Sequence, residues 1–498
     1  MKSIAPCIEH VRTKTQGLVE GSICYTGDIL DIKNTKYNLR YYINLAKEIE
    51  NAGAHILGIK DMAGLLKPYA ASELITALKS ELKIPIHLHT HDTSSIQAAT
   101  YLKAIEAGVD VVDVALGGLS GLTSQPNFNS IVEMMKFNER ENPININSLN
   151  EYSNYWETVR TYYYPFESGL KSGSGEVFKH EIPGGQYSNL KPQAQALGLE
   201  DRFHEITKMY AEVNILFGNI IKVTPSSKVV GDMAQYLVSN NLTIKDVLEK
   251  GDSISFPQSV VSFFKGDLGQ PVNGFPKELQ KIILKDQKPF IDRPNEHILP
   301  TDFEKEYADF RNIFEKDLGR NIDFTDFLSF KLYPKVFTDA YNQHLKYDNL
   351  TNLPTKNFFY GMEIGEEITI EIDRGKMLLV TLDSVGKPNT KGMVTVYFKV
   401  NGQARTVKVK DASIKVETIK NVKADKSNVQ QLGAPLQGLL STILVKEGED
   451  VVKNQPLFII EAMKMETTIS ATENATINKI SLKAGVMVHS DDLVIELK

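Results

Sequence analysis

Three histidines, His87, His89 and His91, alternate along one short apolar segment. Side chains two residues apart on a β-strand share one face, at steps of about 6.6 to 6.8 Å. Imidazole nitrogens are common ligands of divalent transition metals. In a parallel α/β fold the C-terminal end of a strand carries the chemistry, which makes His89 and His91 the better ligands and His87 a deeper packing or supporting residue. On spacing alone, histidines that only pack fit the pattern equally well.

Lys60 ends the apolar segment before the histidines, within Gly58-Ile59-Lys60-Asp61-Met62. A protonated lysine has no lone pair to offer a metal, whereas a carbamylated lysine presents carboxylate oxygens. Lys60 could therefore join a metal site only in the carbamylated form.

A second candidate for chemistry is Lys464, which lies between two halves of an internal repeat. The repeat matches residues 443–448 with 480–485, and residues 457–461 with 493–496. It predicts two similar β-halves with a tight exposed turn that holds Lys464 away from the body of the domain. An amine at the tip of a rigid hairpin can carry a flexible, amide-linked group between distant sites. An ordinary solvated turn lysine is the alternative.

The histidine segment is one of four apolar runs, which begin near Ser22, His55, Ile84 and Val109 and are separated by helix-like segments. This rhythm predicts parallel strands covered by helices. A barrel of eight such units needs about 250 residues, and the rhythm stops near Pro126 after four. We therefore expect a partial TIM (β/α) barrel, completed by another chain, closed with a partner copy, or truncated.

The remaining chain divides into a helical and a β-rich part. Residues 143–350 are mainly helical in pattern, whereas apolar residues alternate at 368–372 and 394–400. The second alternation runs into Asn401-Gly402, which predicts a hairpin with a type I′ turn. We expect a multidomain α/β and β protein whose domains are the partial barrel (1–140), its helical extension (141–350), a small β-rich domain (351–422) and a C-terminal β-sandwich (423–498).

The composition of the chain excludes several classes of protein. A chain of 498 residues with 42% apolar and 24% charged residues is globular and long enough for three or four domains. The net charge of −6 argues against a nucleic-acid binder. Cys7 and Cys24 are too few for a disulfide framework, and no apolar run is long enough to span a membrane. The expected protein is soluble and cytoplasmic.

The C-terminal repeat resembles the biotin carboxyl carrier domain, and Ala462-Met463-Lys464-Met465 matches the attachment motif of that domain in full. The resemblance implies biotin on Lys464. A lipoyl domain shares the fold, but the methionines on both sides of Lys464 favour biotin.

The whole chain resembles the C-terminal portion of the pyruvate carboxylases. The segments that carry the resemblance are residues 60–68, 87–94, 122–126, 183–190 and 222–232. It implies that carbamylated Lys60, His89 and His91 bind a divalent metal, zinc or manganese. Thr224 would be the catalytic proton shuttle. The residues implied to line the biotin pocket are Gln186, Ser227 and Lys228. Residues 356–418 look like the tetramerisation and allosteric domain of the family.

The implied reaction transfers a carboxyl group from carboxybiotin on Lys464 to pyruvate. Thr224 would relay a proton from the pyruvate methyl group to biotin, and the resulting enolate would take up CO₂ to give oxaloacetate. The implied partners are pyruvate and oxaloacetate, a biotin carboxylase domain or subunit, biotin protein ligase and further copies of the chain, a tetramer in the family. We expect neither nucleic acid nor membrane as a partner.

The sequence also departs from the family pattern. The ATP-using biotin carboxylase half is not found, nor are the first barrel strands, which bring an aspartate ligand and a substrate-binding arginine in the family. Two alternatives therefore stay open: a subunit of a biotin-dependent oxaloacetate decarboxylase or transcarboxylase, and an inactive biotinylated carrier fragment. The β-rich unit before the carrier domain argues against the decarboxylase.

Overall fold

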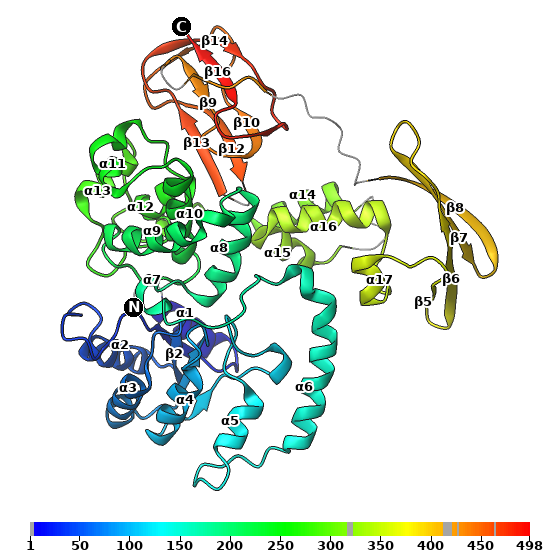
Figure 1. Ribbon diagram of the computed structural model, residues 1–498. Helices are drawn as coiled ribbons and strands as arrows, with labels where there is room; N and C mark the ends of the chain where they lie inside the picture. The colour runs from blue at the N-terminus through cyan, green and yellow to red at the C-terminus, as the bar shows by residue number, and fades with distance from the viewer. Residues whose placement is uncertain (1–3, 316–321, 412–420, 426–427, 463–464) are drawn as a thin grey trace. The chain divides into compact units, whose positions relative to one another are not determined.

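The computed structural model describes residues 4–315, 322–411, 421–425, 428–462 and 465–498, and Figure 1 shows their arrangement into elements. The chain forms two compact units. One unit contains residues 1–296 together with 421–498, and the other contains residues 297–420.

A four-stranded parallel sheet in the order β1-β2-β3-β4 begins the first unit. Helices connect successive strands, so the predicted rhythm of strands and helices is confirmed for this segment. The elements are α1 (Ile4–Lys14), β1 (Glu20–Cys24), α2 (Leu39–Asn51), β2 (Ile56–Asp61), α3 (Pro68–Glu81), β3 (Ile86–Thr90), α4 (Gln97–Glu106) and β4 (Val111–Val112).

Helix α2 illustrates how the sequence positions these elements. The side chain of Asn38 accepts a hydrogen bond from the backbone N–H of Tyr41, which caps the N-terminus of the helix. Its buried residues, Tyr42, Ala46 and Ile49, recur at helical spacing and pack into the core around the sheet. The chain then turns at Gly53 with a φ of 97°, a value that favours glycine.

A helical part follows the sheet within the same unit. Its main core lies between α8, α9, α10 and α12. The helices are α5 (Phe128–Met134), α6 (Ile146–Arg160), α7 (Val177–His180), α8 (Gly184–Ala196), α9 (Phe203–Leu216), α10 (Ser226–Ser239), α11 (Ile244–Lys250), α12 (Gln258–Lys265) and α13 (Lys277–Leu284). Short 3₁₀ helices are η1 (Gly117–Leu119), η2 (Thr161–Phe166), η3 (Glu200–Arg202), η4 (Gly251–Ser253) and η5 (Pro294–His297).

The C-terminal segment of this unit is a sandwich of two four-stranded sheets, in the orders β13-β12-β10-β15 and β9-β16-β14-β11. In the repeat, β13, β12, β10 and β15 correspond to β9, β16, β14 and β11. The two sheets therefore have the same order of equivalent strands. The two predicted halves are therefore confirmed, and each contributes strands to both sheets. The strands are β9 (Gln431–Gly433), β10 (Gly438–Ile443), β11 (Asp450–Val451), β12 (Pro456–Ala462), β13 (Met465–Ser470), β14 (Ala475–Ile480), β15 (Met487–Val488) and β16 (Leu493–Leu497).

The second unit combines helices with an antiparallel sheet in the order β5-β6-β7-β8. Asn401 and Gly402 both have positive φ, 48° and 80°, as the predicted type I′ turn requires. The elements are α14 (Phe303–Phe314), α15 (Phe324–Leu332), α16 (Pro334–Tyr347), α17 (Thr355–Tyr360), β5 (Glu367–Asp373), β6 (Lys376–Val385), β7 (Met393–Val400) and β8 (Gln403–Lys410).

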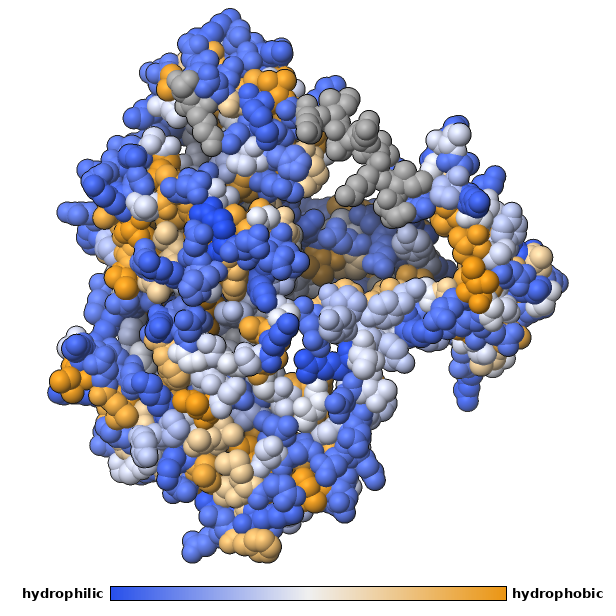
Figure 2. All heavy atoms as spheres, viewed as in Figure 1, coloured by the Kyte–Doolittle hydropathy of each residue, from blue (hydrophilic) through white to orange (hydrophobic). Residues whose placement is uncertain are grey.

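The compact units divide at other residues than the predicted domains. Helices α14 to α16 belong with the β5–β8 sheet, whereas the sequence pattern grouped residues 141–350 together. The sheet also exposes the side chains of Met377, Leu379, Tyr397, Val407 and Val409. Figure 2 shows hydrophobic residues at the surface of this part of the chain.

Two further expectations can be compared with the fold. Cys7 and Cys24 are both free thiols. Among the described residues, no helix has both the length and the apolar character that a membrane span requires.

Asp61 ties the ends of β2 and β3 together. Its fully buried carboxylate accepts hydrogen bonds from the backbone N–H groups of Leu65 and Leu66, at 2.9 and 2.8 Å, and from the Thr90 hydroxyl at 2.8 Å. Burial raises the pKa of Asp61, and these hydrogen bonds oppose the rise. Asp61 thus links the loop after β2 to the end of β3.

We predict that Asp61→Ala destabilises this sheet by about 3 kcal/mol, because two buried N–H groups lose their acceptor. Urea unfolding followed by circular dichroism measures the loss, and hydrogen exchange at Leu65 and Leu66 should accelerate. Thr90→Val is the matched control, since it removes one hydrogen bond and should cost about 1 kcal/mol. Unchanged exchange at both amides in Asp61→Ala would contradict this role.

Candidate functional site

The candidate residues of the sheet meet at the C-terminal ends of β2 and β3. Lys60 pairs with His89 in the register of these two parallel strands. Leu88 and Thr90 are buried on the opposite face from the partly exposed histidines, so the predicted alternation is confirmed. The side chain of Lys60 is exposed. The fold therefore places Lys60 beside both candidate histidine ligands.

His89 and His91 turn their Nε2 atoms toward one another, 3.2 Å apart. The other ring nitrogens both face oxygen acceptors. Nδ1 of His89 lies 2.7 Å from Oδ2 of Asp113, and Nδ1 of His91 lies 2.6 Å from the carbonyl oxygen of Thr123. A ring that donates from Nδ1 carries a lone pair on Nε2 when it is neutral. Two lone pairs therefore converge on one point, an arrangement that suits a cation.

Burial is the main cause that lowers the pKa of His91. The hydrogen bond to Thr123 opposes this shift, whereas the charges of His89 and Lys60 add to it. A neutral His91 keeps its Nε2 lone pair available as a ligand.

Histidine, cysteine, aspartate and glutamate alone do not complete a metal site. Within the described residues, no three side chains of these types are grouped so that they could hold an ion. Lys60 is the neighbour that could add oxygen ligands, and only as a carbamate.

Thr224, Ser227 and Lys228 lie at the start of α10. The Thr224–Pro225 peptide bond is cis, and Thr224 itself is exposed. Ser227 is buried, and the Lys228 ammonium forms an ion pair with Asp232 one turn further along the helix. The three predicted residues are thus grouped at one helix terminus.

Sequence reasoning assigned no role to Asp232, although it ends a segment that carries the resemblance. Its carboxylate is buried and also accepts a 2.6 Å hydrogen bond from the Ser259 hydroxyl. Burial raises the pKa of Asp232, and the charge of Lys228 opposes the rise. Asp232 therefore orients Lys228.

Gln186 lies on α8 with 8% of its surface exposed, and its buried Nε2 has no hydrogen-bond partner. A Cβ atom at Gly231 would stand 2.7 Å from this nitrogen, so glycine permits the close approach of α10. Gly231 follows Ser227 by one helical turn, which places Gln186 beside the same face of α10. An unpaired buried amide is a donor that a ligand carbonyl could satisfy.

The beginning of α8 connects the two groups of candidates. Gly184 donates its N–H to the carbonyl oxygen of Met62 at 2.8 Å. A Cβ atom at Gly184 would stand 2.8 Å from Nδ1 of His91. The turn that carries Gln186 therefore packs directly on the histidine site.

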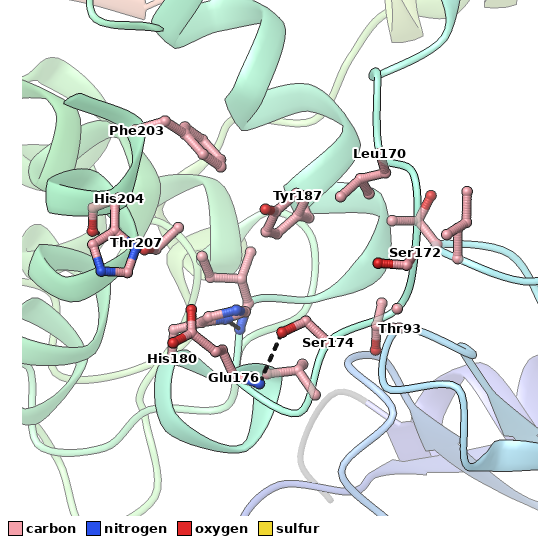
Figure 3. A pocket seen from close by; sticks show the side chains of 15 residues that line it. Thr93, Leu170, Ser172, Ser174, Glu176, His180, Tyr187, Phe203, His204 and Thr207 are labelled. Carbon is pink, nitrogen blue, oxygen red and sulfur yellow. Dashed lines mark hydrogen bonds between the residues drawn. The ribbon is translucent and has the colours of Figure 1, made fainter. Parts of the chain in front are cut away.

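A cavity of about 130 Å³ lies close to His91 and is lined by Thr93 and Thr123, among others. Figure 3 shows His180 and Tyr187 on its wall, with the Ser174 hydroxyl accepting a hydrogen bond from the backbone N–H of Glu176. The sequence pattern did not single out this cavity.

His180 is held neutral in this wall. Its Nδ1 accepts a 3.0 Å hydrogen bond from the backbone N–H of Ile182. Burial lowers the pKa of His180 from 6.5 to about 4, although Glu176 and Glu181 oppose the shift.

Comparisons with known proteins identify three domain families along the chain. Residues 1–155 match the HMGL-like family, residues 177–381 match the conserved carboxylase domain, and residues 430–497 match the biotin-requiring enzyme domain.

The curated relatives are longer than this chain. The pyruvate carboxylase of Bacillus subtilis is 50% identical over 498 residues, which cover 100% of this chain and 43% of the relative. The mitochondrial pyruvate carboxylase of Homo sapiens is 40% identical, with 97% and 41% covered.

Solved structures give the same result. The chain resembles a complete multifunctional pyruvate carboxylase from Rhizobium etli with a TM-score of 0.75 and 46% identity, over 99% of this chain and 45% of that one. It also resembles the carboxyl transferase domain of that enzyme with pyruvate and biocytin, at a TM-score of 0.77 and 49% identity, over 82% and 68% of the two chains.

An HMGL-like segment, a conserved carboxylase domain and a biotin-requiring domain together define a biotin-dependent carboxylase. The chain spans less than half the length of its curated relatives. It belongs to the pyruvate carboxylase family and corresponds to the C-terminal portion of its members. The predicted family, the barrel type and the carrier domain type are confirmed.

We predict that the stability of the helical part falls as the pH drops from 6.5 to 4, because only the unfolded state protonates His180 in this range. The full effect is about 3 kcal/mol at most. His180→Asn keeps an acceptor for Ile182 but does not titrate, so its melting temperature should depend less on pH. His204→Asn, also on the cavity wall, is the control. Identical pH profiles for wild type and His180→Asn would refute the assignment.

Proposed function

We propose that this chain is the carboxyltransferase and biotin-carrier part of a pyruvate carboxylase, which transfers a carboxyl group from biotin to pyruvate and forms oxaloacetate. The observation that carries the proposal is the pair of converging Nε2 atoms of His89 and His91, with Lys60 in register beside them. The Rhizobium etli structures with pyruvate and with biocytin support these ligands.

His89, His91 and carbamylated Lys60 would hold a divalent metal, zinc or manganese. The donor set fits such an ion, because two imidazole lone pairs already converge and a carbamate adds oxygen ligands. When bound, the metal stabilises negative charge that develops on the substrate oxygen. Asp113 and the Thr123 carbonyl hold the two rings in the ligating orientation.

Lys464 would carry biotin, attached by a biotin protein ligase. This residue lies outside the described residues, as does the predicted exposed turn around it. The flanking strands are described, and Ala462 at the end of β12 pairs with Met465 at the start of β13. Biotin, when attached, carries the carboxyl group that is to be transferred.

Gln186, Ser227 and Lys228 would form the pocket that receives biotin. The unpaired Nε2 of Gln186 can donate to the ureido carbonyl oxygen, which would satisfy a buried amide. Lys228, oriented by Asp232, adds positive charge beside that oxygen.

Thr224 would move the proton. CO₂ would leave as the bond between it and the biotin nitrogen breaks, and the exposed Thr224 hydroxyl can donate its proton to that nitrogen while accepting one from the pyruvate methyl group, so the residue ends unchanged. The substrate carbon is left as an enolate, which forms the new bond to CO₂.

The chain would act within a larger assembly. The β1–β4 sheet would be part of a TIM barrel, and a biotin carboxylase domain or subunit would supply the carboxyl group. Residues 351–422 would form the tetramerisation and allosteric domain, and the exposed apolar side chains of the β5–β8 sheet support a role in assembly. We propose the cytoplasm as its location.

We predict that the purified chain decarboxylates oxaloacetate when free biotin is added, since this reverse half-reaction needs the carboxyltransferase site and no ATP. Thr224→Ala should lose activity by about 10²-fold or more, because the proton relay is broken. Thr224→Ser retains the hydroxyl and is the matched control. If a folded, biotinylated wild-type chain shows no activity, the proposed carboxyltransferase role is wrong and only the carrier role remains.

We also predict that biotin protein ligase and ATP attach one biotin to the chain, and that Lys464→Arg abolishes the attachment because it removes the primary amine. Intact-mass spectrometry measures the product. Lys479→Arg, on β14 of the same sandwich, should still be labelled. Labelling of Lys464→Arg at the wild-type level would disprove the attachment site.

A further inference from the structure

We propose that Glu20, His87 and Asp113 form a hydrogen-bonded chain that positions His89 as a metal ligand, with His87 as its central positioning residue. The inference rests on the metal site proposed above. It adds residues that act through Asp113 and do not contact the ion.

The contacts form an unbroken series. Oε2 of Glu20 lies 2.9 Å from Nδ1 of His87, and Nε2 of His87 lies 2.8 Å from Oδ1 of Asp113. The second oxygen of Asp113 lies 2.7 Å from Nδ1 of His89. Carboxylates and imidazoles thus alternate, and each contact joins an acceptor to a possible donor.

This hydrogen-bonded series spans the sheet from β1 to Asp113, which directly follows β4. Glu20 begins β1, and His87 and His89 lie on β3, so the Glu20 side chain must pass over β2. The β2 residue in register with His87 is Gly58. A Cβ atom at Gly58 would overlap Oε1 of Glu20, so a side chain at this position would displace the glutamate. Glycine therefore opens the path from Glu20 to His87.

The contact with His87 holds the Asp113 carboxylate in place, and this carboxylate in turn orients the His89 ring. Without His87, one oxygen of Asp113 loses its partner, and the carboxylate can rotate away from the His89 ring. The ring would then lose the restraint that directs Nε2 toward His91. Outer hydrogen-bond partners of metal-bound histidines commonly change metal affinity by about 10- to 100-fold. Since the side chains of His87 and Asp113 are 20% and 40% exposed, water competes, and we expect the lower part of this range.

The test measures binding of Zn²⁺ and Mn²⁺ to the full chain by competition with a chromophoric chelator. We expect His87→Leu to bind each metal about tenfold more weakly than wild type. The absorption spectrum of the Co²⁺-loaded chain should also change, because the orientation of the His89 ring is altered. A purely structural role for His87 would move neither quantity.

Two variants keep the test decisive if His87→Leu does not fold. His87→Gln retains an N–H donor toward Asp113 and should recover most of the affinity. Glu20→Gln weakens only the outer contact and should cost less than His87→Leu. Asp110→Asn is the matched control, because Asp110 accepts from the N–H of Ile86 at the opposite end of β3, outside this series.

The outcomes separate the two proposals. Metal binding by wild type, with equal affinity in His87→Leu or Glu20→Gln, overturns the positioning role and leaves the metal site intact. A wild-type chain that binds neither ion overturns both. An equal loss of affinity in Asp110→Asn would show a general effect of sheet stability and would also overturn the positioning role.

Discussion

The candidate site depends on the hydrogen-bonded register between β2 and β3. Backbone pairing sets Lys60 beside His89, and a shift of one residue would turn the functional side chains of the shifted strand to the opposite face. The opposite face is filled by Leu88 and Thr90, which are fully buried. A shift in register would bury an imidazole and expose a leucine, which is unfavourable. Burial of the apolar face therefore maintains the geometry of the polar site. Asp61 further stabilises this register, because its carboxylate joins the loop after β2 to Thr90.

Much of this architecture could be predicted because it follows from local periodicity. The alternation of His87, His89 and His91 determines their common face, and two positive φ values at Asn401 and Gly402 follow from the turn residues themselves. The repeat in the C-terminal segment also revealed its two halves. In each case the cause lies within a few residues, or within two copies of one pattern.

Contacts between distant segments could not be predicted in this way. Asp113 pairs with His89 only because β4 lies next to β3, and Glu20 reaches His87 only because β2 carries a glycine between them. A lone glutamate or aspartate on the sequence carries no sign of such a partner. The division into compact units at residue 297 is of the same kind, since helical periodicity does not show which unit a helix joins.

The symmetry of the carrier sandwich has a mechanical consequence. In the repeat, β12 corresponds to β16, and β13 corresponds to β9. The junction of β12 and β13 therefore corresponds to the place where β16 ends and β9 begins, and Gln431 pairs there with Glu496. The chain therefore enters and leaves this domain at one end, whereas Ala462 and Met465 meet at the other end (Figure 1). The seven residues of β12 span about 24 Å between these ends. The end formed by Ala462 and Met465 therefore lies a full strand length from the point where the chain enters the domain.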